Sequence, residues 1–180
     1  MNQFLTVETT YAVLACLTYL LVALFVVFFG LSRFSNRLRR AWSGFRVGIA
    51  PYALPFGWLA SAVAMSGSLY LSEIAGLPPC RLCWYQRIAM YPLVLLLGIA
   101  TFRHGLTTAK RYFLPLAAIG GVISAYHYQL ERFPDQVALA CTVDLPCSVP
   151  VVNLWGFASV PFMALAAFAI IITLLWVAQD

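Results

Sequence analysis

The sequence has few charged residues. Only 9% of its 180 residues are Asp, Glu, Lys or Arg, whereas 63% are hydrophobic, and the mean hydropathy is +0.88. Ordinary soluble domains carry about 25% charged residues, so this scarcity excludes that class. The apolar residues form continuous runs and lack the alternation over about 10 residues that is typical of membrane β-barrel strands. We therefore predict an all-α integral membrane protein.

Other scarcities narrow the possible functions. The chain has two histidines, His104 and His127, which we expect on opposite membrane faces, and this excludes a haem held by both. The first ten residues contain Glu8 but no Lys or Arg, so we expect no cleaved signal peptide. The net charge of +5 comes from basic residues beside apolar segments, where they set membrane orientation rather than bind nucleic acid.

Five apolar segments are long enough to cross a membrane as helices. They cover approximately residues 11–31, 51–74, 84–102, 112–128 and 155–177. Residues 51–180 should form a four-helix transmembrane bundle with two extracytoplasmic cysteine loops. Residues 1–50 should add one transmembrane helix and a basic cytoplasmic loop.

The distribution of basic residues predicts the orientation, because cytoplasmic loops are enriched in Lys and Arg. The segments after the first and third spans are the richest, with Arg33, Arg37, Arg39, Arg40 and Arg46 in one and Arg103, Lys110 and Arg111 in the other. We therefore expect the N-terminus outside, the C-terminus in the cytoplasm and both cysteine-bearing segments outside. That compartment permits disulfides.

Four of the five cysteines form two pairs, Cys80 with Cys83 and Cys141 with Cys147. A Cys-x-x-Cys spacing often lowers the pKa of one thiol. Arg87 follows Cys83 by four residues and would share its helix face. The positive charge of Arg87 and the positive N-terminal end of a helix starting near Cys83 would both stabilise a negative charge on the Cys83 sulfur. We therefore expect Cys83 to be the thiolate of the pair.

Three kinds of chemistry fit these cysteines: thiol–disulfide exchange, inert structural disulfides, or a zinc site made by all four. A disulfide between Cys80 and Cys83 would close a very short loop and stabilise little. The separation of Cys141 from Cys147 is wider than zinc sites usually show, and we expect no metal. Redox exchange is the favoured interpretation. Cys16, inside the first span, is interpreted as a packing residue.

The second pair lies in a segment of about 25 residues, 129–153, where a soluble thiol protein could attack it through a mixed disulfide. It could also simply close a small loop. Four cysteines allow three pairings. A relay requires Cys80–Cys83 and Cys141–Cys147 at rest, with a bond between the two segments during turnover.

The run Cys-Arg-Leu-Cys-Trp-Tyr-Gln-Arg at 80–87 resembles the signature of the disulfide bond formation protein B/C family (DsbB, BdbC), membrane thiol–quinone oxidoreductases. The resemblance covers about residues 57–177, and the close spacing of the second pair is similar to C-type members. It implies a quinone, ubiquinone or menaquinone, as cofactor. It also implies a thioredoxin-fold thiol oxidase partner of the DsbA/BdbD kind, and a location in the bacterial cytoplasmic (inner) membrane.

The resemblance also implies a role for each cysteine. The reduced partner would attack Cys141, and Cys147 would pass electrons on through an inter-loop bond with Cys80. Cys83 would react with the quinone, whose developing negative charge Arg87 would stabilise. The N-terminal residues 1–50 depart from the family's four-span core.

His127 occupies a position similar to the family's quinone-proximal histidine, and it could donate to a carbonyl oxygen of a bound ring. An interfacial histidine in an aromatic belt is the alternative. Two other functions are alternatives to thiol–quinone oxidoreduction. An outward electron-carrying reductase resembling vitamin K epoxide reductase is disfavoured, because there the Cys-x-x-Cys follows the loop pair. A non-enzymatic membrane scaffold with structural disulfides would need no reactive thiol.

Overall fold

The structure is a computed structural model that describes residues 2–103, 106–135, 141 and 146–178. Its helices are α1 (Asn2–Ser32), α2 (Asn36–Leu69), α3 (Arg81–Phe102), α4 (Leu106–Arg132) and α5 (Val160–Val177), and a π-helical turn, η1 (Tyr70–Ile74), continues α2. The described residues form no named strand. The all-α fold class is therefore confirmed.

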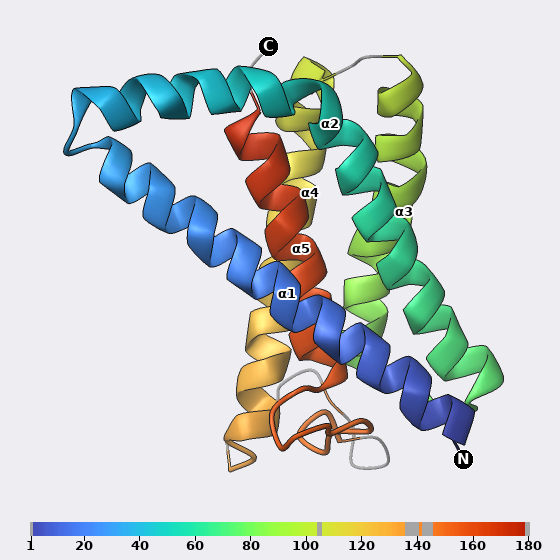
Figure 1. Ribbon diagram of the computed structural model, residues 1–180. Helices are drawn as coiled ribbons and strands as arrows, with labels where there is room; N and C mark the ends of the chain where they lie inside the picture. Colours follow the sequence, from blue (N-terminus) through green and yellow to red (C-terminus); the bar gives the residue numbers. More distant parts are fainter. Residues whose placement is uncertain (1, 104–105, 136–140, 142–145, 179–180) are drawn as a thin grey trace.

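Helices α2 to α5 form a closed ring, because α2 contacts α3 and α5, and α4 contacts the same two helices. Helix α1 lies outside this ring, where it crosses diagonally and contacts α5 and α2 (Figure 1). The apolar core inside the ring includes Leu93, Leu97, Phe168, Ile171 and Leu175, all of them buried. This arrangement is the predicted four-helix bundle with one additional N-terminal helix.

Four helical segments are long and apolar enough to cross a membrane. They are Phe4–Ser32, Asn36–Ile74, Arg81–Phe102 and Val160–Val177. Helix α4, which contains the predicted fourth span, has 27 residues but is not among these four. It packs between α3 and α5 in the ring. The fold is that of a multi-pass membrane protein.

The basic segment predicted as a loop is instead helical from Asn36 onward. Helix α2 contains Pro51 and Pro55, and prolines inside a helix remove backbone hydrogen bonds and cause kinks. Figure 1 shows the consequence: the first part of α2 lies across the upper end of the bundle, and the rest descends along it. A helix can carry the same arginines as a loop, so charge alone did not distinguish the two.

Helix α5 begins five residues later than predicted, at Val160. The preceding residues form a tight turn closed by reciprocal backbone hydrogen bonds of 2.9 Å between Leu154 and Ala158. Gly156 adopts a φ of 75° in this turn, which glycine tolerates without steric cost. A second left-handed glycine, Gly76 with a φ of 69°, follows η1 and ends the helix before Pro78 and Pro79.

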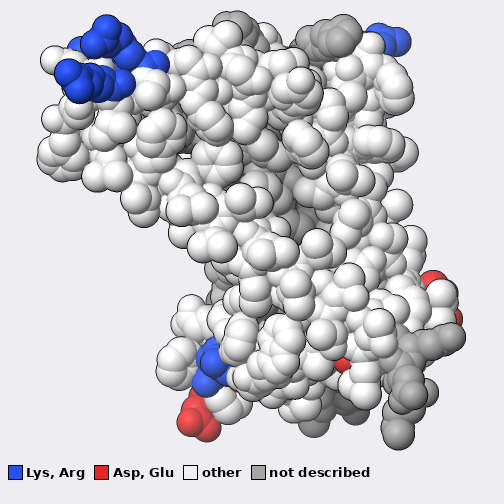
Figure 2. All heavy atoms as spheres, in the orientation of Figure 1, with Lys and Arg blue, Asp and Glu red and all other residues white. Residues whose placement is uncertain are grey.

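The two ends of the molecule differ in charge. On the face in Figure 2, most basic atoms gather at the two upper corners, while the acidic atoms lie in the lower half, together with a smaller basic area at the lower left. Figure 1 places the N-terminus and the loop that follows α4 at the lower end, and the C-terminus at the upper end. The cysteine-bearing segments therefore lie at the end opposite the main basic groups.

Candidate functional site

The Cys-x-x-Cys pair forms the start of α3. Cys80 is the residue before the first helical turn, with φ −67° and ψ 171°, and its sulfur accepts a hydrogen bond from the backbone N–H of Cys83 at 3.3 Å. The sulfurs of Cys80 and Cys83 lie 2.9 Å apart and are not bonded to each other. The pair is thus held as two thiols at hydrogen-bond distance.

This helix start differs from the predicted one. A helix beginning near Cys83 would have directed its positive end at the Cys83 sulfur, but α3 begins at Arg81. The free N–H groups of a helix lie in its first turn, so here the sulfur that receives one belongs to Cys80. The hydrogen bond donated by the Cys83 thiol is the main cause that lowers the pKa of the Cys80 thiol. Burial opposes this effect, and His127 adds to it.

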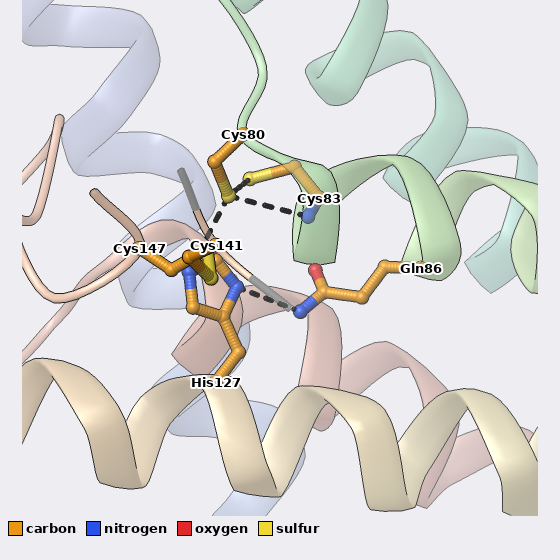
Figure 3. Close-up of a disulfide and its surroundings, with 6 residues drawn as sticks. All are labelled: Cys80, Cys83, Gln86, His127, Cys141 and Cys147. Carbon is orange, nitrogen blue, oxygen red and sulfur yellow. Dashed lines mark hydrogen bonds between the residues drawn. A yellow bond between two sulfur atoms is a disulfide. The ribbon is translucent and has the colours of Figure 1, made fainter. Parts of the chain in front are cut away.

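His127, from α4, and Gln86, from α3, form a hydrogen-bonded chain that ends at Cys80 (Figure 3). The ring Nε2 of His127 lies 3.6 Å from the Cys80 sulfur, and its Nδ1 lies 3.1 Å from the amide nitrogen of Gln86. Both side chains are buried. With the amide oriented in this way, Nδ1 accepts from Gln86, which leaves the ring proton on Nε2, facing sulfur.

Cys141 and Cys147 form a disulfide, with their Cα atoms 5.9 Å apart. Cys147 is buried and Cys141 is partly exposed. The Cys147 sulfur, the Cys80 sulfur and a ring nitrogen of His127 all lie within 4.8 Å of one another. The second pair therefore presents its buried sulfur to the first pair and keeps the other nearer the surface.

These three ligand-type atoms could in principle hold a metal ion. Zinc, however, requires deprotonated cysteine thiolates, and the Cys147 sulfur is bonded to Cys141. A zinc site made by all four cysteines would also require both members of each pair as free thiolates. The arrangement is instead that of one disulfide packed against two free thiols, Cys80 and Cys83.

Arg87 does not contact Cys83 through a hydrogen bond in the described residues, although the two share a helix face. Its Nε donates to the Ser68 hydroxyl and its Nη2 to the Ser68 carbonyl oxygen, each at 2.9 Å. The guanidinium also lies 5.3 Å from the centre of the Trp84 ring. These contacts fix Arg87, which is 9% exposed, in the wall of a cavity.

That cavity has a volume of about 340 Å³ and lies among α1, α2, α3 and α5. Its wall is mostly apolar, and Cys83, Gln86, Arg87 and Tyr91 contribute polar groups from α3. A smaller cavity of about 190 Å³ lies beside the second cysteine pair, and its lining includes Cys80, His127, Glu131 and Cys147. Cys83 lines both cavities, so it connects the apolar space to the second cysteine pair.

Several site residues were missed by the sequence analysis. Gln86 follows Cys83 by three residues, so its place on the same helix face could have suggested a role. Ser68 carried no such signal, because it is one of several small polar residues in α2. Glu8, which also lines the larger cavity, lay outside the predicted first span.

Comparison with known proteins gives the family of this chain. The family model described as "Disulfide bond formation protein DsbB" matches residues 52–178. The chain is 52% identical to disulfide bond formation protein C of Bacillus subtilis over 116 residues, which cover 64% of this chain and 83% of that protein. It is 39% identical over 132 residues to a probable disulfide formation protein C 2 of Bacillus cereus, covering 73% and 94% of the two chains.

A probable disulfide formation protein of Oceanobacillus iheyensis is 43% identical over 122 residues, covering 65% of this chain and 81% of that one. The chain matches no solved structure. All three alignments cover most of the relative's length. The family match leaves out α1 and the first part of α2. With most of the chain matched, this protein belongs to the DsbB family of disulfide bond formation proteins and is a membrane oxidoreductase of disulfide formation.

Proposed function

We propose that the protein oxidises a thioredoxin-fold dithiol partner and passes the electrons through its two cysteine pairs to a membrane quinone. The observation that carries this proposal is the grouping of the Cys147 and Cys80 sulfurs within 4.8 Å, beside His127. A disulfide bond is about 2.05 Å long, so these two sulfurs need to approach by no more than about 2.8 Å to bond. Side-chain and loop motion on that scale is sufficient.

The exchange steps balance as two-electron transfers. One partner thiolate attacks Cys141 and releases the Cys147 thiolate, and the second partner thiol then displaces Cys141, which leaves the partner oxidised. Cys147 next attacks Cys80 of an oxidised Cys80–Cys83 pair and frees Cys83. Cys141 resolves the inter-loop bond by attacking Cys147, and Cys80 leaves as a thiol. The first pair then carries both electrons.

The larger cavity fits a quinone head group. Its volume of about 340 Å³ is within the ~300–1,000 Å³ of typical small-molecule sites. An apolar wall suits the ring and its isoprenoid tail, while Arg87 and Gln86 offer hydrogen-bond donors to ring oxygens. Cys83 is the member of the first pair that faces this space. A bound quinone would supply the chemistry of accepting two electrons and two protons.

The proposed orientation places the cysteine end outside the cytoplasm. The basic residues gathered at the opposite end support it, because cytoplasmic segments are enriched in Lys and Arg. Both pairs would then face a compartment in which a thiol oxidase partner must be kept oxidised.

The relay is tested with two matched double variants. Cys83→Ala with Cys141→Ala leaves Cys80 and Cys147 as the loop cysteines, while Cys80→Ala with Cys141→Ala leaves Cys83 and Cys147. After mild oxidation of the purified proteins, mass spectrometry of non-reduced peptides measures the inter-loop disulfide. We expect the Cys80–Cys147 bond to form at least ten times faster than the Cys83–Cys147 bond.

Equal rates for the two double variants would contradict the assigned order of the relay. The complete function is tested by mixing the wild-type protein, a reduced thioredoxin-fold partner and a quinone, and following quinol formation by absorbance. Absence of quinol with correctly folded protein would exclude the quinone oxidoreductase. Cys141→Ala should block partner oxidation but leave a slower reaction of the first pair with small thiols.

A further inference from the structure

The N-terminal half of helix α1 docks on the bundle at the end that holds the cysteines, although α1 lies outside the family match. The Tyr11 ring packs directly on Gly67 of α2, where an added Cβ would lie 2.7 Å from a ring carbon. The Tyr11 hydroxyl lies 3.3 Å from the Ser66 hydroxyl. Farther along, the Tyr19 hydroxyl donates to the Phe162 carbonyl oxygen at 3.0 Å. These contacts fix α1 in one position against α2 and α5.

In this position α1 supplies one wall of the larger cavity. Glu8, Tyr11, Ala15 and Thr18 line it, opposite groups that α2, α3 and α5 contribute. Glu8 is only 6% exposed, and its Oε1 has no hydrogen-bond partner among the described residues. Buried polar groups are normally paired, and an acidic residue inside a membrane helix usually marks a functional site. Glu8 is thus a buried carboxyl with unused hydrogen-bonding capacity in a ligand-sized cavity.

We propose that Glu8 binds the quinone head group, so that α1 is part of the acceptor site. This inference rests on the proposed quinone oxidoreductase function. A carboxyl in an apolar wall favours its neutral, protonated form, which can donate a hydrogen bond to a carbonyl oxygen. A quinone ring carries two carbonyl acceptors, and the cavity offers donors from two helices, Glu8 on α1 and Arg87 on α3.

The proposal is tested by equilibrium binding of decylubiquinone to the purified full-length protein in nanodiscs, followed by tryptophan fluorescence. Glu8→Met keeps the size of the side chain but removes the donor, and we expect its Kd to rise about tenfold, the effect of losing one hydrogen bond. Glu8→Gln retains an N–H donor and should stay within about threefold of wild type. The matched control is Glu73→Met, which removes an exposed carboxyl at the same end of the molecule.

A Glu8→Met protein that binds decylubiquinone as tightly as wild type would overturn the inference while leaving the proposed function intact. Wild-type protein that neither binds quinone nor forms quinol would overturn the proposed function, and the inference with it. A second measurement avoids dependence on variant folding. A photoreactive azidoquinone should label the α1 peptide that contains Glu8, and labelling confined to α2 and α5 would contradict the proposal.

Discussion

Gln86 has a testable role in setting the reactivity of Cys80, because it is hydrogen-bonded to His127, which in turn faces the Cys80 sulfur. Gln86→Leu keeps a side chain of similar size but removes the partner of His127 Nδ1, which lies 3.1 Å away. His127 is 2% exposed, so this nitrogen would be left buried and unpaired. Such a loss costs about 1–3 kcal/mol of stability.

The same substitution should change the titration of the first cysteine pair. The Cys83 hydrogen bond and the His127 contact both lower the pKa of Cys80. In Gln86→Leu the ring is no longer held with its proton toward sulfur, so the pKa of Cys80 should rise. It should remain below that of an ordinary thiol, because the Cys83 hydrogen bond is retained. Thiolate absorbance near 240 nm, followed against pH in the protein with Cys141–Cys147 intact, measures the shift.

Gln86→Glu is the matched control and should act in the opposite direction. A carboxylate at this position would accept a hydrogen bond from an Nδ1–H group and so favour a His127 ring that carries protons on both nitrogens, whose positive charge stabilises the Cys80 thiolate. In the Gln86→Glu protein, the titration curve of the Cys80 thiol should therefore lie at lower pH than in wild type. Identical curves for wild type, Gln86→Leu and Gln86→Glu would refute the chain from Gln86 to Cys80 and leave Gln86 as a packing residue.

Two further predictions concern stability in detergent. Gly120→Ala should lower the unfolding free energy by about 1–3 kcal/mol, because the added methyl would overlap the Phe168 ring at the contact of α4 with α5. Gly44→Ala is its control, since nothing lies within 4 Å of the added atom. This substitution should raise the unfolding free energy by up to about 1 kcal/mol, because alanine favours a helix more than glycine does. Equal effects at the two glycines would contradict the close contact. Ser68→Ala removes the acceptor of the Arg87 Nε and should cost about 1.5 kcal/mol in thermal or denaturant unfolding. An unchanged transition would show that this hydrogen bond contributes nothing.

The helical membrane fold and the Cys141–Cys147 disulfide could be predicted from the sequence, because each depends on local features. The resting disulfide that the relay requires between Cys80 and Cys83 is not present in the structure, where both are free thiols. Apolar runs identify segments that can cross a membrane regardless of their neighbours. The pairing of Cys141 with Cys147 follows from their closeness in the chain. Which sulfur of that pair faces the first one is a matter of tertiary structure. The family resemblance assigned Cys147 to Cys80, and the 4.8 Å grouping is consistent with that assignment.

Helix ends were harder to predict than helix existence. Hydropathy marks the part of a helix that lies in hydrocarbon, whereas the helix itself continues as long as its backbone hydrogen bonds are made. Helix α1 accordingly begins at Asn2, nine residues before the predicted span, and α2 at Asn36. Glu8 therefore counted as an extramembrane residue in the sequence analysis, although it faces a cavity of the bundle.

The different surroundings of Cys80 and Cys83 follow from the start of α3. A residue that caps a helix and the residue three positions later face each other, since the capping side chain accepts from the backbone N–H of the later one. The Cys-x-x-Cys spacing matches this geometry, with Cys80 as the cap and Cys83 as the third helical residue.

The sulfurs are thereby held 2.9 Å apart, so forming a bond of about 2.05 Å requires an approach of about 0.9 Å, with little movement of the backbone. The dithiol form and the disulfide form of Cys80 and Cys83 can therefore both be accommodated by the same backbone at the start of α3. The cap position directs Cys80 toward His127 and Cys147, while Cys83, inside the helix, lines the larger cavity as well. An inserted residue between the two cysteines would rotate the second by about 100° around the helix. The second sulfur would then no longer lie both beside Cys80 and in the wall of the larger cavity.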